Sequence, residues 1–225
     1  HDVADRVAAG QAYTVFEANG AQPAAYSLTA SAREEFTPYM WDFPFFGPSA
    51  IKGFFDRGMG QREADQLSLL GYDVYYARVD GFSTLGLLPD PVRQSNLQLD
   101  DIELAELILH EMIHSTVFKS SDINFSESLA TFVGRAAAQA WFDQTYGADS
   151  LEAAAARTRY ADKAVIDAYV NELYAVVLQY YQDSAVAGIP RDDIIAGRQE
   201  HFDAEAARFI AVYQPTLLDP ARWEY

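Results

Sequence analysis

The chain has 225 residues, half of them hydrophobic and 14% aromatic, which is the composition of a globular protein large enough for one well-buried domain. Its 33 acidic and 16 basic side chains give a net charge of −17, which argues against nucleic acid or an anionic membrane surface as the partner. It contains no cysteine, which excludes disulfides and thiolate metal ligands, and no apolar run approaches the length of a membrane span.

The first 60 residues predict short strands and loops. Residues 13–16 and 25–28 are rich in aromatic and β-branched side chains, and Asn19-Gly20 between them is a turn signal. Residues 41–48 are aromatic but contain two prolines and a glycine, so we expect a packed loop there, either a wall of a substrate pocket or plain core. Residues 51–55 predict another strand.

A helix and the clearest strand of the chain follow. The spacing of apolar residues predicts a helix over residues 61–70 that stops at Gly71. Residues 72–79 predict a strand, and Asp80-Gly81 after it is a tight-turn dipeptide. Residues 85–97 contain two prolines and predict a loop that leads to the next helix.

Residues 102–118 predict a helix that contains the pentapeptide His110-Glu111-Met112-Ile113-His114. Asp100 and Glu103 have the spacing of a capping box at its start, and its apolar residues lie on nearly every side, which is typical of a buried helix. On a helix, two histidines four residues apart share one face, with Cβ atoms about 5–6 Å apart. This separation suits two imidazoles that bind one metal ion and leaves Glu111 beside the open coordination position.

A second helix is predicted to begin near Asn124 or Ser126, with Glu127 in its first turn. Small residues on the next turns would let it lie close against the first helix and bring Glu127 to the metal as a third ligand. These small residues are Ala130, Thr131 and Gly134. In the alternative interpretation, Glu127 only favours the helix dipole, and the two histidines are core residues paired with carboxylates such as Glu106.

The remainder of the chain predicts helices. The second helix continues to residue 146 and ends near Gly147, and apolar residues at three-and-four spacing predict further helices over residues 151–183 and 191–213. Residues 215–225 predict an irregular tail. A strand-rich part over residues 1–97 and a helical part over residues 98–225 together predict an α+β fold in one domain, residues 1–225.

The Glu-x-x-Ala pattern of Glu127 and Ala130, downstream of the pentapeptide, resembles the third-ligand motif of gluzincin metallopeptidases. The chain is similar over residues 40–135 to the bacterial family of predicted zinc aminopeptidases, and the likeness fades outside that span. The matching segments are 41–44, 51–55, 71–75, 82–86, 90–92, 110–114 and 125–132. The chain departs from the gluzincin pattern at Ser126, where these enzymes usually have Asn beside the ligand Glu.

The resemblance implies a zincin-like fold, with a small, twisted, mainly antiparallel sheet packed on a metal-binding helix pair. It implies one Zn²⁺ ion held by His110, His114 and Glu127. It also implies peptide-bond hydrolysis, of aminopeptidase type, by activated water with Glu111 as the general base. The donor that would stabilise the oxyanion stays unknown. The candidates downstream of Glu127 are Tyr169, Tyr174, Tyr180, Tyr181, Arg198 and His201.

In zincins, a sheet edge beside the metal helix pairs with the extended substrate. We expect residues 74–84 to do so here, with Tyr75, Phe82, Ser83 and Thr84 in contact with the peptide, although an interior strand without substrate contact is the alternative. A second function also stays open, namely a catalytically inactive zinc-binding module that binds a peptide or a partner. Because the chain begins with His1 and not Met, we expect a fragment or a processed form, and we favour the bacterial cell envelope over the cytoplasm.

Overall fold

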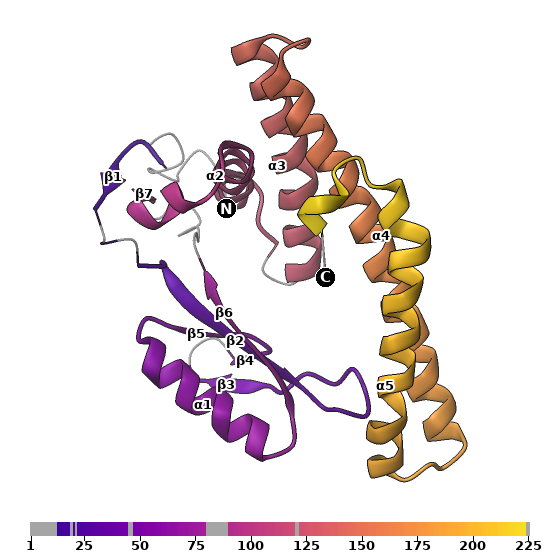
Figure 1. Ribbon diagram of the computed structural model, residues 1–225. Coiled ribbons are helices and arrows are strands. Elements are labelled where there is room, and N and C mark those ends of the chain that lie inside the picture. The colour runs from indigo at the N-terminus through magenta and orange to yellow at the C-terminus, as the bar shows by residue number, and fades with distance from the viewer. Residues whose placement is uncertain are drawn as a thin grey trace. The chain divides into compact units, whose positions relative to one another are not determined.

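The computed structural model describes residues 13–18, 20, 22–44, 47–79, 90–119 and 122–223 (Figure 1). Its architecture is α+β, with short strands before residue 94 and long helices after residue 100. The strands are β1 (Phe16–Glu17), β2 (Ala25–Ser31), β3 (Trp41–Phe43), β4 (Gly47–Ser49), β5 (Lys52–Phe54), β6 (Asp73–Val79) and β7 (Val92–Arg93). The helices are α1 (Arg57–Leu69), α2 (Asp101–Thr116), α3 (Ile123–Tyr146), α4 (Leu151–Val186) and α5 (Arg191–Arg208). Within these ranges, no helix is long and apolar enough to cross a membrane.

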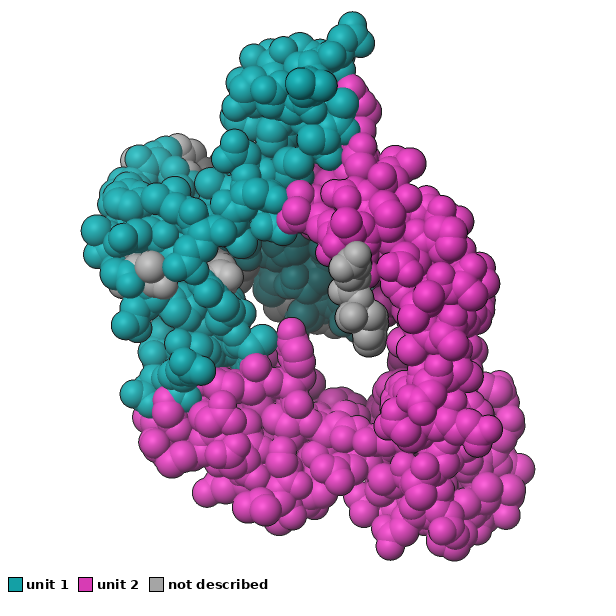
Figure 2. Space-filling model, in the orientation of Figure 1, with its two compact units in different colours: residues 1–27, 53–57, 77–156 teal, residues 28–52, 58–76, 157–225 magenta. Residues whose placement is uncertain are grey.

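The chain divides into two compact units (Figure 2). Unit 1 comprises His1–Ser27, Gly53–Arg57 and Ala77–Ala156, and unit 2 comprises Leu28–Lys52, Gly58–Tyr76 and Arg157–Tyr225. Strands β2, β5 and β6 and helices α1 and α4 each contribute residues to both units. Unit 1 contains α2 and α3, and unit 2 contains α5 and most of α4.

Within the described residues, the strands form three small sheets. The largest has the order β5-β2-β6, so β6 lies at an edge of the described sheet. In the second sheet, β1 runs parallel to β7, and in the third, β3 runs antiparallel to β4. Most of these strands have only two or three residues, which is too short to build one continuous sheet.

The loop predicted for residues 41–48 is wrong, because β3 and β4 form a hairpin there with Trp41 opposite Ser49 and Asp42 opposite Pro48. A proline is tolerated in such a two-stranded edge because its missing N–H need not face the partner. Trp41 is buried, and its indole N–H donates to Glu63 at 2.6 Å, which favours the core-packing interpretation of this aromatic segment. Glu63 also pairs with Lys52 at 2.7 Å.

The strand and loop expected around β1 and β7 are shifted in the structure. The expected strand over residues 13–16 is reduced to Phe16–Glu17 and pairs with Val92–Arg93. The loop predicted for residues 85–97 is therefore wrong at its end, where β7 is followed by a 3-10 helix, η2 (Gln94–Gln98). Residues 80–89, including the predicted Asp80-Gly81 turn, lie outside the described residues.

Helix α1 begins one turn earlier than the predicted residue 61, even though that turn contains two glycines. A Cβ atom at Gly60 would lie 2.4 Å from the Tyr76 hydroxyl oxygen, so the ring of Tyr76 packs directly on this turn. Tertiary packing therefore outweighs the low helix propensity of glycine. The predicted stop at Gly71 is confirmed, with φ of +87°, a left-handed value that favours glycine.

The C-terminal half follows the helical periodicity closely. Helices α4 and α5 lie side by side (Figure 1), and a buried cluster of Val177, Tyr181 and Ile194 joins them. A π-helical turn, η3 (Phe209–Tyr213), continues α5 to the residue where the last helix was predicted to end.

The expected irregular tail contains two short 3-10 helices, η4 (Gln214–Thr216) and η5 (Pro220–Trp223). Leu217 is buried against Tyr169 and Phe209. The backbone N–H groups of Leu218 and Asp219 donate to the carboxylate of Asp162, which is 1% exposed. These non-local contacts order a segment that local patterning predicts to be irregular.

Candidate metal centre

Helix α2 begins at the predicted capping box. The Asp100 carboxylate accepts a hydrogen bond from the Glu103 N–H at 2.9 Å, and the Glu103 carboxylate accepts one from the Asp100 N–H at 3.4 Å. The expectation of burial on all sides is wrong, because only His114 and Ser115 are fully buried in α2. Helix α3 is the main packing partner of α2, so the other apolar side chains are half-buried.

Helix α3 begins at Ile123, and the Asp122 carboxylate caps it by accepting the Phe125 N–H at 3.1 Å. The predicted close approach of the two helices is present. Ala130 is fully buried, and a Cβ atom at Gly134 would lie 3.0 Å from the backbone nitrogen of His110 and 3.1 Å from its Cα. Helix α3 therefore packs almost backbone to backbone against the turn of α2 that carries the first histidine.

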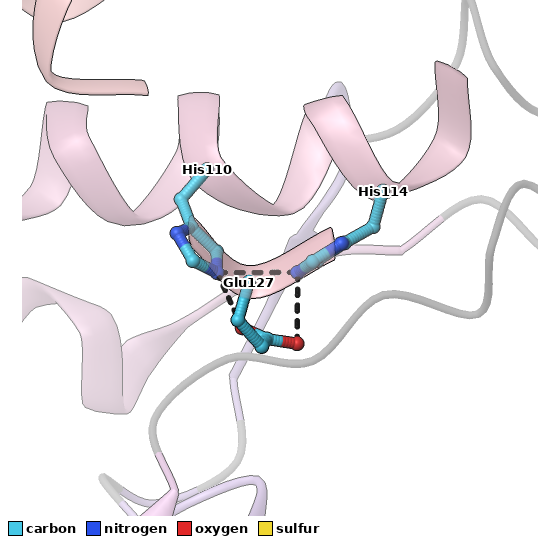
Figure 3. Close-up of side chains that lie close together, drawn as sticks. All are labelled: His110, His114 and Glu127. Atoms are coloured by element: carbon cyan, nitrogen blue, oxygen red, sulfur yellow. Dashed lines mark hydrogen bonds and ion pairs between the residues drawn. The ribbon is translucent and has the colours of Figure 1, made fainter. Parts of the chain in front are cut away.

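This packing brings His110, His114 and Glu127 together, as the sequence predicted (Figure 3). The Nε2 atoms of the two histidines are 3.2 Å apart. Glu127 places Oε2 at 3.2 Å from Nε2 of His110 and Oε1 at 3.4 Å from Nε2 of His114. The His114 side chain is 7% exposed, whereas that of Glu127 is 52% exposed, so the cluster is open to solvent on the Glu127 side.

The spacing of the two imidazole nitrogens and the Glu127 carboxylate suits a zinc ion. Tetrahedral coordination with bonds of about 2.0–2.1 Å places neighbouring ligand atoms about 3.3–3.4 Å apart. The separation of 3.2 Å between the two Nε2 atoms lies close to that value, and so do the distances from His110 to Oε2 and from His114 to Oε1 of Glu127, 3.2 and 3.4 Å. Two imidazoles and one carboxylate are also the donor set of many catalytic zinc sites, which keep the fourth position open.

Electrostatics favours the metal-binding form of His110. Burial lowers the pKa of His110, the neighbouring His114 lowers it further, and Glu127 and Glu106 oppose the shift only in part. A lowered pKa keeps the imidazole neutral at pH 7, with an electron pair available for a metal. Glu106, the carboxylate of the alternative interpretation, accepts a hydrogen bond from Arg135 at 3.0 Å.

The ring nitrogens that point away from the cluster differ in their surroundings. His110 Nδ1 lies 3.5 Å from the Thr131 hydroxyl oxygen, at the limit of a hydrogen bond. His114 Nδ1 is buried and has no hydrogen-bond partner in the described chain. Metal-binding histidines usually donate this second N–H, so the support around His114 is less complete than around His110.

Glu111 lies half-buried on α2, and its charge acts on a residue that the sequence analysis did not select, Tyr13. Burial raises the pKa of the Tyr13 phenol strongly, and the negative charges of Glu111 and Asp90 raise it further. The Tyr13 hydroxyl is shielded from solvent and has no hydrogen-bond partner among the described residues, and the φ of +60° at Tyr13 is unusual for a bulky residue. No local pattern marks Tyr13, because only the fold brings it near Glu111.

The predicted substrate-binding residues are only partly described. Tyr75 is 69% exposed on the edge strand β6, which argues against the alternative of an interior strand, and Phe82, Ser83 and Thr84 lie outside the described residues. The end of β6 belongs to unit 1, the unit of the triad. There the Arg78 guanidinium donates to Gln98 at 3.2 Å, which ties β6 to the turn before α2.

The candidate oxyanion donors downstream of Glu127 all belong to unit 2, whereas the triad belongs to unit 1. The Tyr169 hydroxyl donates to the backbone oxygen of Glu205 at 3.0 Å, and the Tyr180 hydroxyl donates to that of Ile194 at 2.8 Å. Further contacts engage the other candidates: Arg198 with Asp73, Tyr181 with Arg198, Tyr174 with Phe36, and His201 with Tyr180.

Comparison with known proteins supplies one match. A protein-family model described as "Putative aminopeptidase" matches residues 6–223, almost the whole chain and more than the span over which the resemblance was visible by motif. No curated protein and no solved structure gives a significant match. The extent of the family match settles the classification, and the chain belongs to the putative aminopeptidase family.

Proposed function

We propose that this protein is a zinc-dependent peptidase of aminopeptidase type. The main support for this proposal is that His110, His114 and Glu127 lie together at separations that suit one tetrahedral zinc ion. Membership of the family described as putative aminopeptidase supports peptide hydrolysis as the reaction. The zincin-like arrangement of sheet and helix pair is part of this proposal.

We assign the steps of peptide hydrolysis to the zinc site, Glu111 and strand β6. Lewis-acid activation of a water molecule and of the scissile carbonyl is the chemistry that a bound zinc ion supplies. Glu111 follows the first ligand on α2, takes the proton of the water as general base and passes it to the leaving amine. The end of β6 that belongs to unit 1, from Ala77 to Val79, pairs with the backbone of an extended peptide substrate.

Tyr13 is a candidate for the oxyanion donor. Its raised pKa keeps the phenol protonated at any physiological pH, so it can donate a hydrogen bond to a developing negative charge. Its oxygen is shielded from solvent, so this role requires the phenol to turn when substrate binds.

The first experiment measures zinc per chain in purified wild type, in Glu127→Ala and in Asp101→Ala, a matched control that removes an exposed carboxylate from the start of α2. We expect about one zinc in the wild type and the control, and a large loss in Glu127→Ala. A folded wild type that takes up no added zinc would refute the proposal and leave the two histidines as hydrogen-bonded core residues.

The second experiment compares the wild type with Glu111→Gln on amino-acid amides and on a library of peptides with free or blocked amino termini. We expect Glu111→Gln to retain zinc and to lose turnover by about 10²–10⁴-fold. Cleavage restricted to free amino termini supports the aminopeptidase class. A zinc-loaded wild type without turnover, whose peptide binding is unchanged in Glu111→Gln, would instead identify an inactive binding module.

A further inference from the structure

A buried hydroxyl group, that of Ser126, contacts the described part of the connection between α2 and α3. Ser126 lies in the first turn of α3 and is 1% exposed. Its Oγ accepts a hydrogen bond from the backbone N–H of Lys119 at 3.0 Å. Its own hydrogen lies within reach of two backbone oxygens, that of Asp122 at 3.2 Å and that of Lys119 at 3.3 Å.

These contacts are distinct from ordinary helix capping. Asp122 already caps α3 through the Phe125 N–H, so the first turn is satisfied without Ser126. The bond to Lys119 crosses the connection and joins the chain just after α2 to the first turn of α3. The Ser126 end of this link is 1% exposed, so water cannot readily take the place of the hydroxyl there.

The position of Ser126 gives the link a consequence for the metal centre. Glu127 is the next residue, and its side chain is 52% exposed, so side-chain packing alone restrains it weakly. The two histidines lie on α2 and Glu127 lies on α3, so the geometry of the triad depends on how the two helices are joined. The close approach of Gly134 to His110 fixes the helices two turns further along, and Ser126 fixes them at the ligand itself.

We propose that Ser126 is a positioning residue for the Glu127 ligand, because its buried hydroxyl joins the start of α3 to the chain that leaves α2. The inference rests on the proposed function, because it requires Glu127 to bind zinc. Residues that orient metal ligands typically change metal affinity by about 10–100-fold when removed. A loss of this size is the expected effect of Ser126→Ala.

The test measures zinc dissociation constants by competition with a chromophoric chelator for wild type, Ser126→Ala and the matched control Ser115→Ala. Ser115 is 3% exposed and follows the ligand His114, but its hydroxyl donates to Met112 within its own helix at 2.7 Å. We expect Ser126→Ala to bind zinc about 10–100-fold more weakly and Ser115→Ala to stay near wild type. Equal affinities of Ser126→Ala and wild type, or equal losses in both variants, would overturn the inference.

A double-mutant cycle separates positioning from general stability. If Ser126 acts through Glu127, Ser126→Ala costs no further zinc affinity in a Glu127→Ala background, whereas a merely structural role predicts the same loss in both backgrounds. Should Ser126→Ala not fold, Ser126→Thr keeps the hydroxyl and replaces it in the test. Ser126→Thr is expected to bind zinc within about threefold of wild type, and a loss of about tenfold or more would count against positioning.

Failure of this inference is distinguishable from failure of the proposed function. A wild type that binds no zinc refutes the three-ligand site and the inference with it. A wild type that binds zinc tightly, loses it in Glu127→Ala and keeps it in Ser126→Ala refutes the role of Ser126 alone.

Discussion

The close approach of α3 to α2 at Gly134 makes Gly134→Ala the sharpest probe of the helix pair. The new Cβ would lie 3.0 Å from the backbone nitrogen of His110, 3.1 Å from its Cα and 3.3 Å from its Cβ. Carbon atoms at rest are about 3.5–4.0 Å apart, so the helices must separate by several tenths of an ångström. Backbone atoms cannot rotate away as a flexible side chain can, so α3 itself has to move.

The expected cost follows from two opposing effects. Overpacking in a well-packed interior costs about 1–3 kcal/mol. Alanine recovers about 1 kcal/mol of helix propensity relative to glycine, which leaves a net destabilisation of about 0–2 kcal/mol. Zinc affinity should fall more clearly than stability, because metal–ligand distances tolerate changes of only about 0.2 Å and Glu127 moves with α3.

The assay combines denaturant unfolding of the metal-free protein with zinc titration, and Ser128→Ala is the control. Ser128 is exposed on α3, so this change also introduces alanine into the helix, but at a position open to solvent. We expect weaker zinc binding in Gly134→Ala and none of this effect in Ser128→Ala. Wild-type zinc affinity in Gly134→Ala, together with higher stability, would show that the helices separate freely and that their spacing does not set the site.

Three further predictions concern the fold around the site and in unit 2. Tyr13→Phe should leave the free energy of unfolding equal or slightly higher, since the buried hydroxyl has no partner, and a loss above about 1 kcal/mol in denaturant unfolding would contradict this. Asp162→Asn should lower the free energy of unfolding by about 1–3 kcal/mol, because an amide has one acceptor oxygen where the carboxylate offers two to the N–H groups of Leu218 and Asp219. Faster proteolysis of residues 214–223 is the second readout. Burial raises the pKa of Glu34, but the hydrogen bond and charge of Arg191, together with backbone hydrogen bonds, lower it overall. Ionised Glu34 therefore stabilises the fold above its unfolded pKa, and this contribution is lost as the pH falls through the folded value, so Arg191→Gln should lower the melting temperature at pH 7 and have less effect at pH 3.

Local patterns predicted helix α2 because its determinants are close in sequence. The capping box of Asp100 and Glu103 and the four-residue spacing of His110 and His114 depend only on helix geometry, and both are present as expected. The small residue at Gly134 indicated the close packing that brings Glu127 to the histidines. The long helices of the C-terminal half were predictable for the same reason, since their apolar periodicity extends over many turns.

The remaining features were decided by contacts between residues distant in sequence. The ring of Tyr76 packs on the first turn of α1, which forms even though it contains two glycines. The hydrogen bond between Trp41 and Glu63 stabilises a proline-containing strand pair where a loop was expected. Tyr13 reaches Glu111 only when the chain is folded, and the hydroxyl of Ser126 finds Lys119 only across the turn between α2 and α3. The sequence by itself determined which helices form and which side chains share a face, because these follow from interactions over three or four residues. Tertiary structure alone decided what surrounds the candidate site, because burial and electrostatic coupling arise only where distant segments pack together.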